Sequence, residues 1–103
     1  MILTYKLGGP DGHTPIPCKD TLEWGRWFEN ISNRTVAKTT IGRFLVSTVF
    51  LGLDHRVSGE SLPVLFETMV FEESESKYQK RCCTWDEAVK QHEEAVEKFE
   101  KGD

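Results

Sequence analysis

No stretch of the sequence is long and apolar enough to cross a membrane. A spanning helix needs about 20 consecutive, mostly apolar residues, and the 103 residues of this chain contain no such run. The opening residues, MILTYKLGGPDG, also lack the apolar segment of a secretory signal peptide. A chain of this length has room for one compact domain. We therefore expect a single globular domain over residues 1–103, located in the cytoplasm and without membrane contact.

Cysteine is scarce, and its placement does not fit a disulfide framework. The sequence has three cysteines, of which Cys82 and Cys83 are adjacent and Cys18 is distant. Neighbouring residues on a strand point to opposite faces, so one of Cys82 and Cys83 should be buried and the other exposed. Cys18 lies in a proline-bounded extended segment rather than at a helix N-terminus, where the helix dipole would lower its pKa. The sequence therefore predicts no cysteine nucleophile.

A surplus of basic residues is also missing. The chain holds 13 Lys and Arg against 17 Asp and Glu, for a net charge of −4. Residues 72–103 hold six basic and ten acidic residues, so 6 − 10 = −4 accounts for the whole imbalance. Direct binding to nucleic acid needs a concentrated basic surface, so we do not expect it. An acidic C-terminal surface can instead meet a basic partner protein.

The first half of the chain predicts a strand, a turn and a short helix. Residues 2–7 alternate apolar and polar side chains, which is typical of a half-buried strand. Asp20 and Glu23 have the spacing of a capping box at a helix start. The apolar stripe of that helix consists of Trp24, Trp27, Phe28 and Ile31. Gly25 weakens the helix, so we expect another backbone to approach it closely.

The second half predicts an antiparallel sheet followed by a long helix. Four segments have strand character, at residues 35–42, 43–53, 62–72 and 77–83, with a hairpin loop at 54–61. Segment 43–53 is apolar on both faces, which favours a central strand covered on both sides. Thr84 and Glu87 form a second capping box, and an amphipathic helix should run from about 85 to 100. The predicted fold is α+β: an antiparallel sheet of about four to six strands with two helices packed on it.

Six sequence blocks carry a resemblance to a known group of proteins. They are DGHTPIPC, LEWGRWFE, VAKTTIG, VSTVFLGLDH, LFETMVFE and TWDEAVKQH. Together they resemble a family of small proteins encoded by bacteriophages and prophages, and the match covers nearly the whole chain. The resemblance implies a phage setting and the cytoplasm of a bacterial host. The family has no assigned activity, so the resemblance implies no cofactor and no catalytic residue.

Four polar residues are candidates for a site near the ends of strands. Asp54, His55 and Arg56 follow the central apolar strand together, and His13 follows the turn GPDG. If both turns lie at one end of the sheet, two imidazoles and a carboxylate could hold zinc or iron. None of the short metal-binding spacings is present, however, and loop capping is the more ordinary role for Asp54 and His55.

Glu67 is a candidate because its neighbours in the strand are apolar. A buried carboxylate is costly unless it is paired. The sequence leaves open whether Glu67 points to solvent or into a polar pocket. The basic residues considered as its partner are Arg26, Lys38, Arg43 and Arg56.

Trp24, Arg26 and Trp27 form the last candidate group. Trp and Arg are the residues most enriched at binding hot spots. Most of the helix stripe should be core, but one indole could protrude and contact a partner. A homodimer through this helix or through an edge strand is also open.

Three functions of different classes fit these observations. Small size and the lack of a catalytic signature favour a non-enzymatic binding protein that engages a host protein, in an anti-defence or host-takeover role. A second reading is a small-ligand or nucleotide sponge in which arginines contact phosphate. A third is a metal-dependent hydrolase that uses His13, Asp54, His55 and Glu67. We expect the first, with no cofactor.

Overall fold

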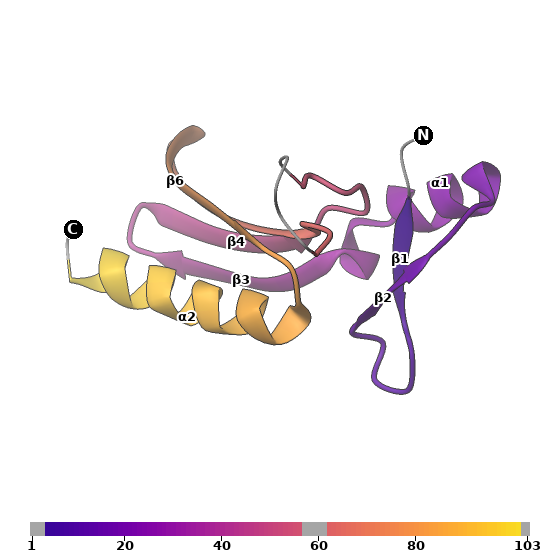
Figure 1. Cartoon of the computed structure of the whole chain (residues 1–103). Coiled ribbons are helices and arrows are strands. Elements are labelled where there is room, and N and C mark those ends of the chain that lie inside the picture. The colour runs from indigo at the N-terminus through magenta and orange to yellow at the C-terminus, as the bar shows by residue number, and fades with distance from the viewer. Residues whose placement is uncertain (1–3, 57–61, 102–103) are drawn as a thin grey trace.

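The computed structural model describes residues 4–56 and 62–101. In these residues the chain forms two antiparallel sheets and two α-helices (Figure 1). The elements are, in chain order, β1 (Tyr5–Gly8), β2 (Thr14–Pro17), α1 (Thr21–Glu29), the 3-10 helix η1 (Ile31–Asn33), β3 (Thr35–Ile41), β4 (Phe44–Phe50), β5 (Phe66–Glu72), β6 (Glu75–Cys82) and α2 (Trp85–Glu100). The predicted α+β class and the long final helix are confirmed.

The smaller sheet is a hairpin of β1 and β2 with α1 beside it. Pro15 and Pro17 lie in β2, which pairs only with β1 among the described strands, so their missing N–H groups cost no inner ladder bond. A 3.0 Å ion pair between Lys6 of β1 and Glu23 ties α1 to this hairpin. In Figure 1 the hairpin and α1 lie together at the opposite end of the molecule from the last turn of α2.

The larger sheet has the strand order β3-β4-β5-β6, and α2 packs along one of its faces. On that face Val46, Thr48 and Phe50 of β4 are completely buried. On the opposite face the alternate residues Leu45 and Val49 are only half-buried. The prediction that both faces of the central strand are covered is therefore met on the α2 side and only partly on the other.

The core between sheet and α2 consists of two apolar clusters with polar residues between them. One cluster contains Tyr5, Phe50, Leu65, Phe66 and Ala88, and the other contains Val46, Val70, Ala95 and Phe99. The four polar side chains between them, all buried, are Thr48, Thr68, Gln91 and His92. Burial of this kind is tolerated only when the polar groups bond to one another, and these do.

The two predicted capping boxes have different outcomes. At α2, Thr84 accepts a hydrogen bond from the Glu87 N–H, and the Glu87 side chain accepts one from the Thr84 N–H, so this capping box is confirmed. At α1, Asp20 accepts from the Glu23 N–H at 3.0 Å. The Glu23 carboxylate instead accepts from Lys6 and Cys18, so the reciprocal half of that box is not formed.

The strand predicted at 62–72 begins later, at Phe66. The residues before it are bonded to the segment that follows β4: the Val64 N–H donates to Asp54 Oδ1 at 3.0 Å, and the His55 N–H donates to the Val64 carbonyl at 2.9 Å. Residues 57–61 of the predicted hairpin loop lie outside the described residues. β4 and β5 do pair as antiparallel neighbours, as predicted.

The close approach expected at Gly25 is found at another glycine. No atom lies within 4 Å of a Cβ built on Gly25. At Gly52 such a Cβ would lie 2.9 Å from the Phe28 ring and 3.3 Å from Trp24, and the φ of Gly52 is +74°. Gly52 thus lets the segment after β4 pass directly against Phe28 and Trp24 of α1.

Candidate functional site

Asp54 organises the segment after β4. Its carboxylate accepts hydrogen bonds from the backbone N–H groups of Arg56 and Val64, and it pairs with the Arg56 guanidinium at 2.8 Å. Partial burial acts to raise the pKa of Asp54, but the bonds from Arg56 and Val64 outweigh it and hold that pKa below its ordinary value. Asp54 therefore acts as an ionised clamp on the loop, which is the loop-capping reading.

The structure does not assemble the histidines and acids into a metal site. His55 Nδ1 lies 2.8 Å from the Leu53 carbonyl, while His13 stacks on Trp85 with ring centroids 3.7 Å apart. No group of three or more His, Cys, Asp or Glu side chains placed to hold a metal occurs in residues 4–56 and 62–101. The geometry therefore gives the metal-dependent hydrolase no support.

Glu67 is buried and paired. It is 9% exposed, and its Oε2 accepts from Arg81 Nε at 2.9 Å and from Gln79 Nε2 at 2.6 Å. Arg81 is none of the four basic residues considered from the sequence. It lies directly opposite Glu67 in the next strand, and cross-strand neighbours of this kind share one face of the sheet.

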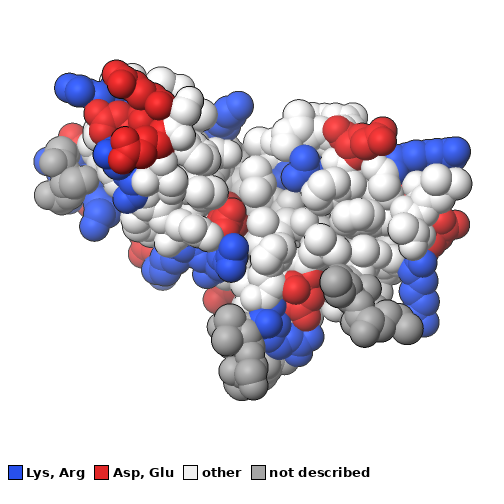
Figure 2. Space-filling view, turned by 90° about the horizontal axis from the view of Figure 1, so that it is seen from above, with Lys and Arg blue, Asp and Glu red and all other residues white. Residues whose placement is uncertain are grey.

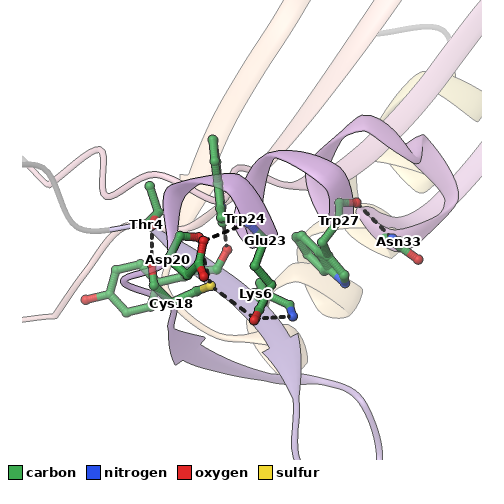
Figure 3. A network of polar contacts seen from close by, with 9 residues as sticks. Thr4, Lys6, Cys18, Asp20, Glu23, Trp24, Trp27 and Asn33 are labelled. Carbon is green, nitrogen blue, oxygen red and sulfur yellow. Dashed lines mark hydrogen bonds and ion pairs between the residues drawn. The ribbon is translucent and has the colours of Figure 1, made fainter.

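The tryptophans of α1 are held by the fold. Trp24 donates from Nε1 to the Tyr5 carbonyl at 3.0 Å, and Trp27 meets Phe50 edge to face with centroids 5.8 Å apart. Figure 3 shows Trp24 directed at the β1 backbone and the Asn33 amide directed at the Trp27 carbonyl. Of the predicted hot-spot group, Arg26 is the exposed member. The structure thus assigns the two indoles to packing.

Cys18 and Cys82 are poor nucleophiles. Cys18 donates its thiol to Glu23, in the network that also includes Lys6 (Figure 3). Desolvation and this hydrogen bond raise the pKa of Cys18, and burial raises the pKa of Cys82 to about 11. Cys82 and Cys83 are both half-buried, so the prediction of one buried and one exposed thiol is wrong. Cys83 does not remain on a regular strand, because β6 ends at Cys82.

The arginines suggested as a phosphate site are also engaged separately. Arg56 pairs with Asp54, and Arg43 pairs with Glu72 at 3.3 Å in a different turn. On the face drawn in Figure 2, Lys and Arg of the described residues are scattered among Asp and Glu rather than gathered into one basic surface. Arg43 and Arg56 therefore do not converge among the described residues, and they give the nucleotide reading no support.

A further candidate site is a groove that the sequence patterns did not predict. It lies between β6 and α2 and has a volume of about 430 Å³. Its lining is Lys80, Arg81, Cys82 and Cys83 from one side and Glu87, Lys90, Gln91 and Glu94 from the other. We call this the β6–α2 groove. Gln91, at 4% exposure, closes its floor by donating to the Lys80 carbonyl at 2.9 Å.

One wall of the groove is an open sheet edge. β6 is the last strand in the order, and its outer side pairs with no other strand among the described residues. The Phe50 N–H donates to the Arg34 carbonyl beside β3, and the next N–H, of Leu51, donates to the Leu65 carbonyl beside β5. By this alternation Val49 faces β5, so its partner Glu67 faces β4, while Phe66 and Thr68 face β6. It follows that Cys82 and Lys80 direct their backbone groups toward β5, whereas Gln79 and Arg81 direct theirs outward.

Sequence patterns alone contain little that points to this groove. Its two walls come from KYQKRCC and from a helix face, and each reads by itself as a solvated surface. The one available signal is the concentration of basic residues in the last predicted strand, since charged side chains are typical of edge strands. The groove exists because α2 returns along the sheet beside that edge.

Comparisons with known proteins add no assignment. No protein-family model, curated protein or solved structure matches this chain. Within residues 4–56 and 62–101, no helix has the length and apolar character of a membrane span.

Proposed function

We propose that this chain is a small non-enzymatic protein, encoded by a phage or prophage, that binds a protein of its bacterial host. The observation that carries the proposal is the open edge of β6 beside the β6–α2 groove. The binding mode is addition of an extended host segment to β6, so that the four-stranded sheet gains a fifth strand.

The edge and the groove supply complementary parts of such a site. Outward backbone groups of Gln79 and Arg81 offer hydrogen bonds that any extended chain can make, and these provide affinity. The groove lies on the α2 side of the edge and receives alternate side chains of the added strand, which provides selectivity. A second copy of the chain would bring another β6 rich in Lys and Arg to this edge, so a foreign segment is the better occupant.

The biological setting of the proposal comes from the resemblance of the six sequence blocks to phage and prophage proteins. In that setting the chain works in the host cytoplasm. Binding of a host segment to β6 would serve an anti-defence or host-takeover role, because the bound segment could no longer contact its usual partner.

The proposal is tested with a proline at the edge. In Gln79→Pro the lost N–H points away from β5, so the ladder is kept and strand addition is blocked. Gln79→Ala is the matched control, because it also removes the side-chain bond to Glu67 but keeps the N–H. Each immobilised protein is incubated with bacterial lysate, and captured proteins are quantified by mass spectrometry.

The expected result is a specific host protein retained by wild type and Gln79→Ala and lost with Gln79→Pro. Circular dichroism and unfolding curves confirm that both variants are folded. Equal capture by all three proteins, or no specific capture by wild type, would contradict the proposal.

A further inference from the structure

We infer that the β6–α2 groove selects a segment carrying an aspartate or glutamate opposite Lys80. This inference rests on the proposed strand addition at β6 and names the chemistry of the partner. It is carried by two lysines, one on each wall of the groove, and by the register of the outer edge of β6.

Lys80 and Lys90 face the groove from β6 and α2 respectively. Lys80 lies opposite Thr68, whose hydroxyl accepts from Gln91 of α2, so Lys80 is on the helix side of the sheet. Within the described part of the chain, neither lysine lies within 4.0 Å of a carboxylate. The groove therefore presents two ammonium groups without a countercharge in contact.

The other charged groups of the groove are largely committed elsewhere. Glu87 Oε1 accepts from the backbone N–H groups of Cys83 and Thr84, which fixes it at the start of α2. Arg81 is bound to Glu67 on the opposite face of the sheet. Glu94 is the second carboxylate of the lining, so the groove holds Lys80, Arg81 and Lys90 against Glu87 and Glu94. Of the three cations, Lys80 and Lys90 have no carboxylate in contact within the described part of the chain, and these two are the groups available to an incoming acidic side chain.

The register places an incoming side chain between the two lysines. Gln79 and Arg81 would form the hydrogen-bonded pairs with an added antiparallel strand. The residue opposite Lys80 then lies in a non-hydrogen-bonded pair, where cross-strand side chains approach most closely. Its side chain points to the α2 side, toward Lys90. An acidic residue at this position forms charge-assisted hydrogen bonds with the lysines. A glutamine forms weaker, uncharged hydrogen bonds, and a lysine is repelled by the two ammonium groups.

The test uses three fluorescein-labelled peptides, Val-Thr-Glu-Thr-Val, Val-Thr-Gln-Thr-Val and Val-Thr-Lys-Thr-Val. In each, alternate residues face the groove, and only the central one differs. Binding is measured by fluorescence polarisation at low ionic strength. We expect the glutamate peptide to bind about tenfold more tightly than the lysine peptide, as one groove charge pair of moderate strength implies.

Matched variants assign the preference to the groove. Lys80→Glu should reverse the order of the glutamate and lysine peptides. Lys98→Glu changes the net charge of the protein by the same amount, but Lys98 lies on α2 and does not line the groove. This variant should therefore leave the order of peptide affinities unchanged. Amide chemical shifts should change at Gln79 and Arg81 with the glutamate peptide.

Three outcomes would overturn the inference. They are equal affinity for all three peptides, a loss of preference in Lys98→Glu as large as in Lys80→Glu, and no binding of any peptide by wild type. If all three peptides bind with equal affinity, strand addition is still supported provided that Gln79→Pro abolishes peptide binding. If no peptide binds to wild type, the lysate experiment still tests the proposed function. That experiment compares host-protein capture by wild type and Gln79→Pro and uses no designed peptide.

Discussion

The imidazole of His92 in α2 is bonded to the hydroxyl of Thr48 in β4, with Nδ1 and Oγ1 2.8 Å apart. The other ring nitrogen, Nε2, lies 2.9 Å from the Thr39 hydroxyl of β3. His92 is only 5% exposed and Thr48 is fully buried. The helix is therefore fixed to two strands by a side chain that can carry a charge, at a place where no described carboxylate lies in contact.

His92 should make the free energy of unfolding depend on pH. Burial lowers its pKa below the ordinary value of 6.5, with Glu93 opposing the effect. Below about pH 6.5 the unfolded chain takes up a proton that the folded chain refuses, so the free energy of unfolding falls as the pH drops toward the folded pKa. The slope is at most about 1.4 kcal/mol per pH unit. Urea unfolding of wild type and His92→Gln between pH 5 and 8 measures it.

The variant is expected to lose that part of the slope. The difference in unfolding free energy between wild type and His92→Gln should shrink as the pH falls through this window. Parallel curves for the two proteins would show that His92 takes up its proton equally in both states.

Substitutions of Gln91, which is buried next to His92 in α2, test the hydrogen bonds that its amide makes. Its Nε2 donates to Thr68 at 3.0 Å and to the Lys80 carbonyl at 2.9 Å. Gln91→Leu keeps the volume and loses both bonds, so it should destabilise by about 1–2 kcal/mol. Gln91→Glu places an acceptor against a carbonyl in a buried site and should cost more. Unfolding curves rank the two, and an equal or smaller loss for Gln91→Glu would contradict the assignment.

These buried polar residues show where sequence patterns stop being informative. Periodicity correctly placed the last helix, its capping box and its apolar stripe, because those are local features. His92 lies on that stripe, among the buried residues of the helix. Gln91 lies beside the stripe and would be read as solvent-facing. Its burial depends on Thr68 and Lys80, which are 23 and 11 residues away in sequence.

The candidate site was missed for the same reason. Glu67 could be recognised as unusual from its apolar neighbours, but its partner Arg81 follows only from the register of β5 and β6. The basic residues of the last predicted strand are typical of an edge, but residue types could not show that α2 returns beside that edge. The β6–α2 groove needs both facts: β6 must be outermost, and α2 must return beside it.

Alanine substitutions at three glycines distinguish the destabilisation caused by backbone strain from that caused by steric contact. Gly52→Ala forces a side chain into φ +74° and places its Cβ 2.9 Å from the Phe28 ring, so it should destabilise by about 2–3 kcal/mol. Gly42→Ala has a φ of +57° but open space, and should cost about 1 kcal/mol. Gly25→Ala lies inside α1 with open space and should stabilise by up to about 1 kcal/mol. Thermal unfolding gives the order, and a loss at Gly25 equal to that at Gly52 would contradict it.

Replacing Asp54 should destabilise the protein more than replacing Arg56, although the two residues form one ion pair. Asp54→Ala leaves the Arg56 and Val64 N–H groups without their acceptor, so it should destabilise by about 1–3 kcal/mol. Arg56→Gln removes the guanidinium but leaves both backbone bonds, and it should cost less because Arg56 is exposed. The pKa of Asp54 lies below its ordinary 3.8, so its contribution is complete above that pH and is lost as the pH falls through the folded pKa. Urea unfolding at pH 7 and at pH 3 should therefore show a smaller difference between wild type and Asp54→Ala at the lower pH. A difference that stays constant with pH would mean that the Asp54 clamp works without its charge.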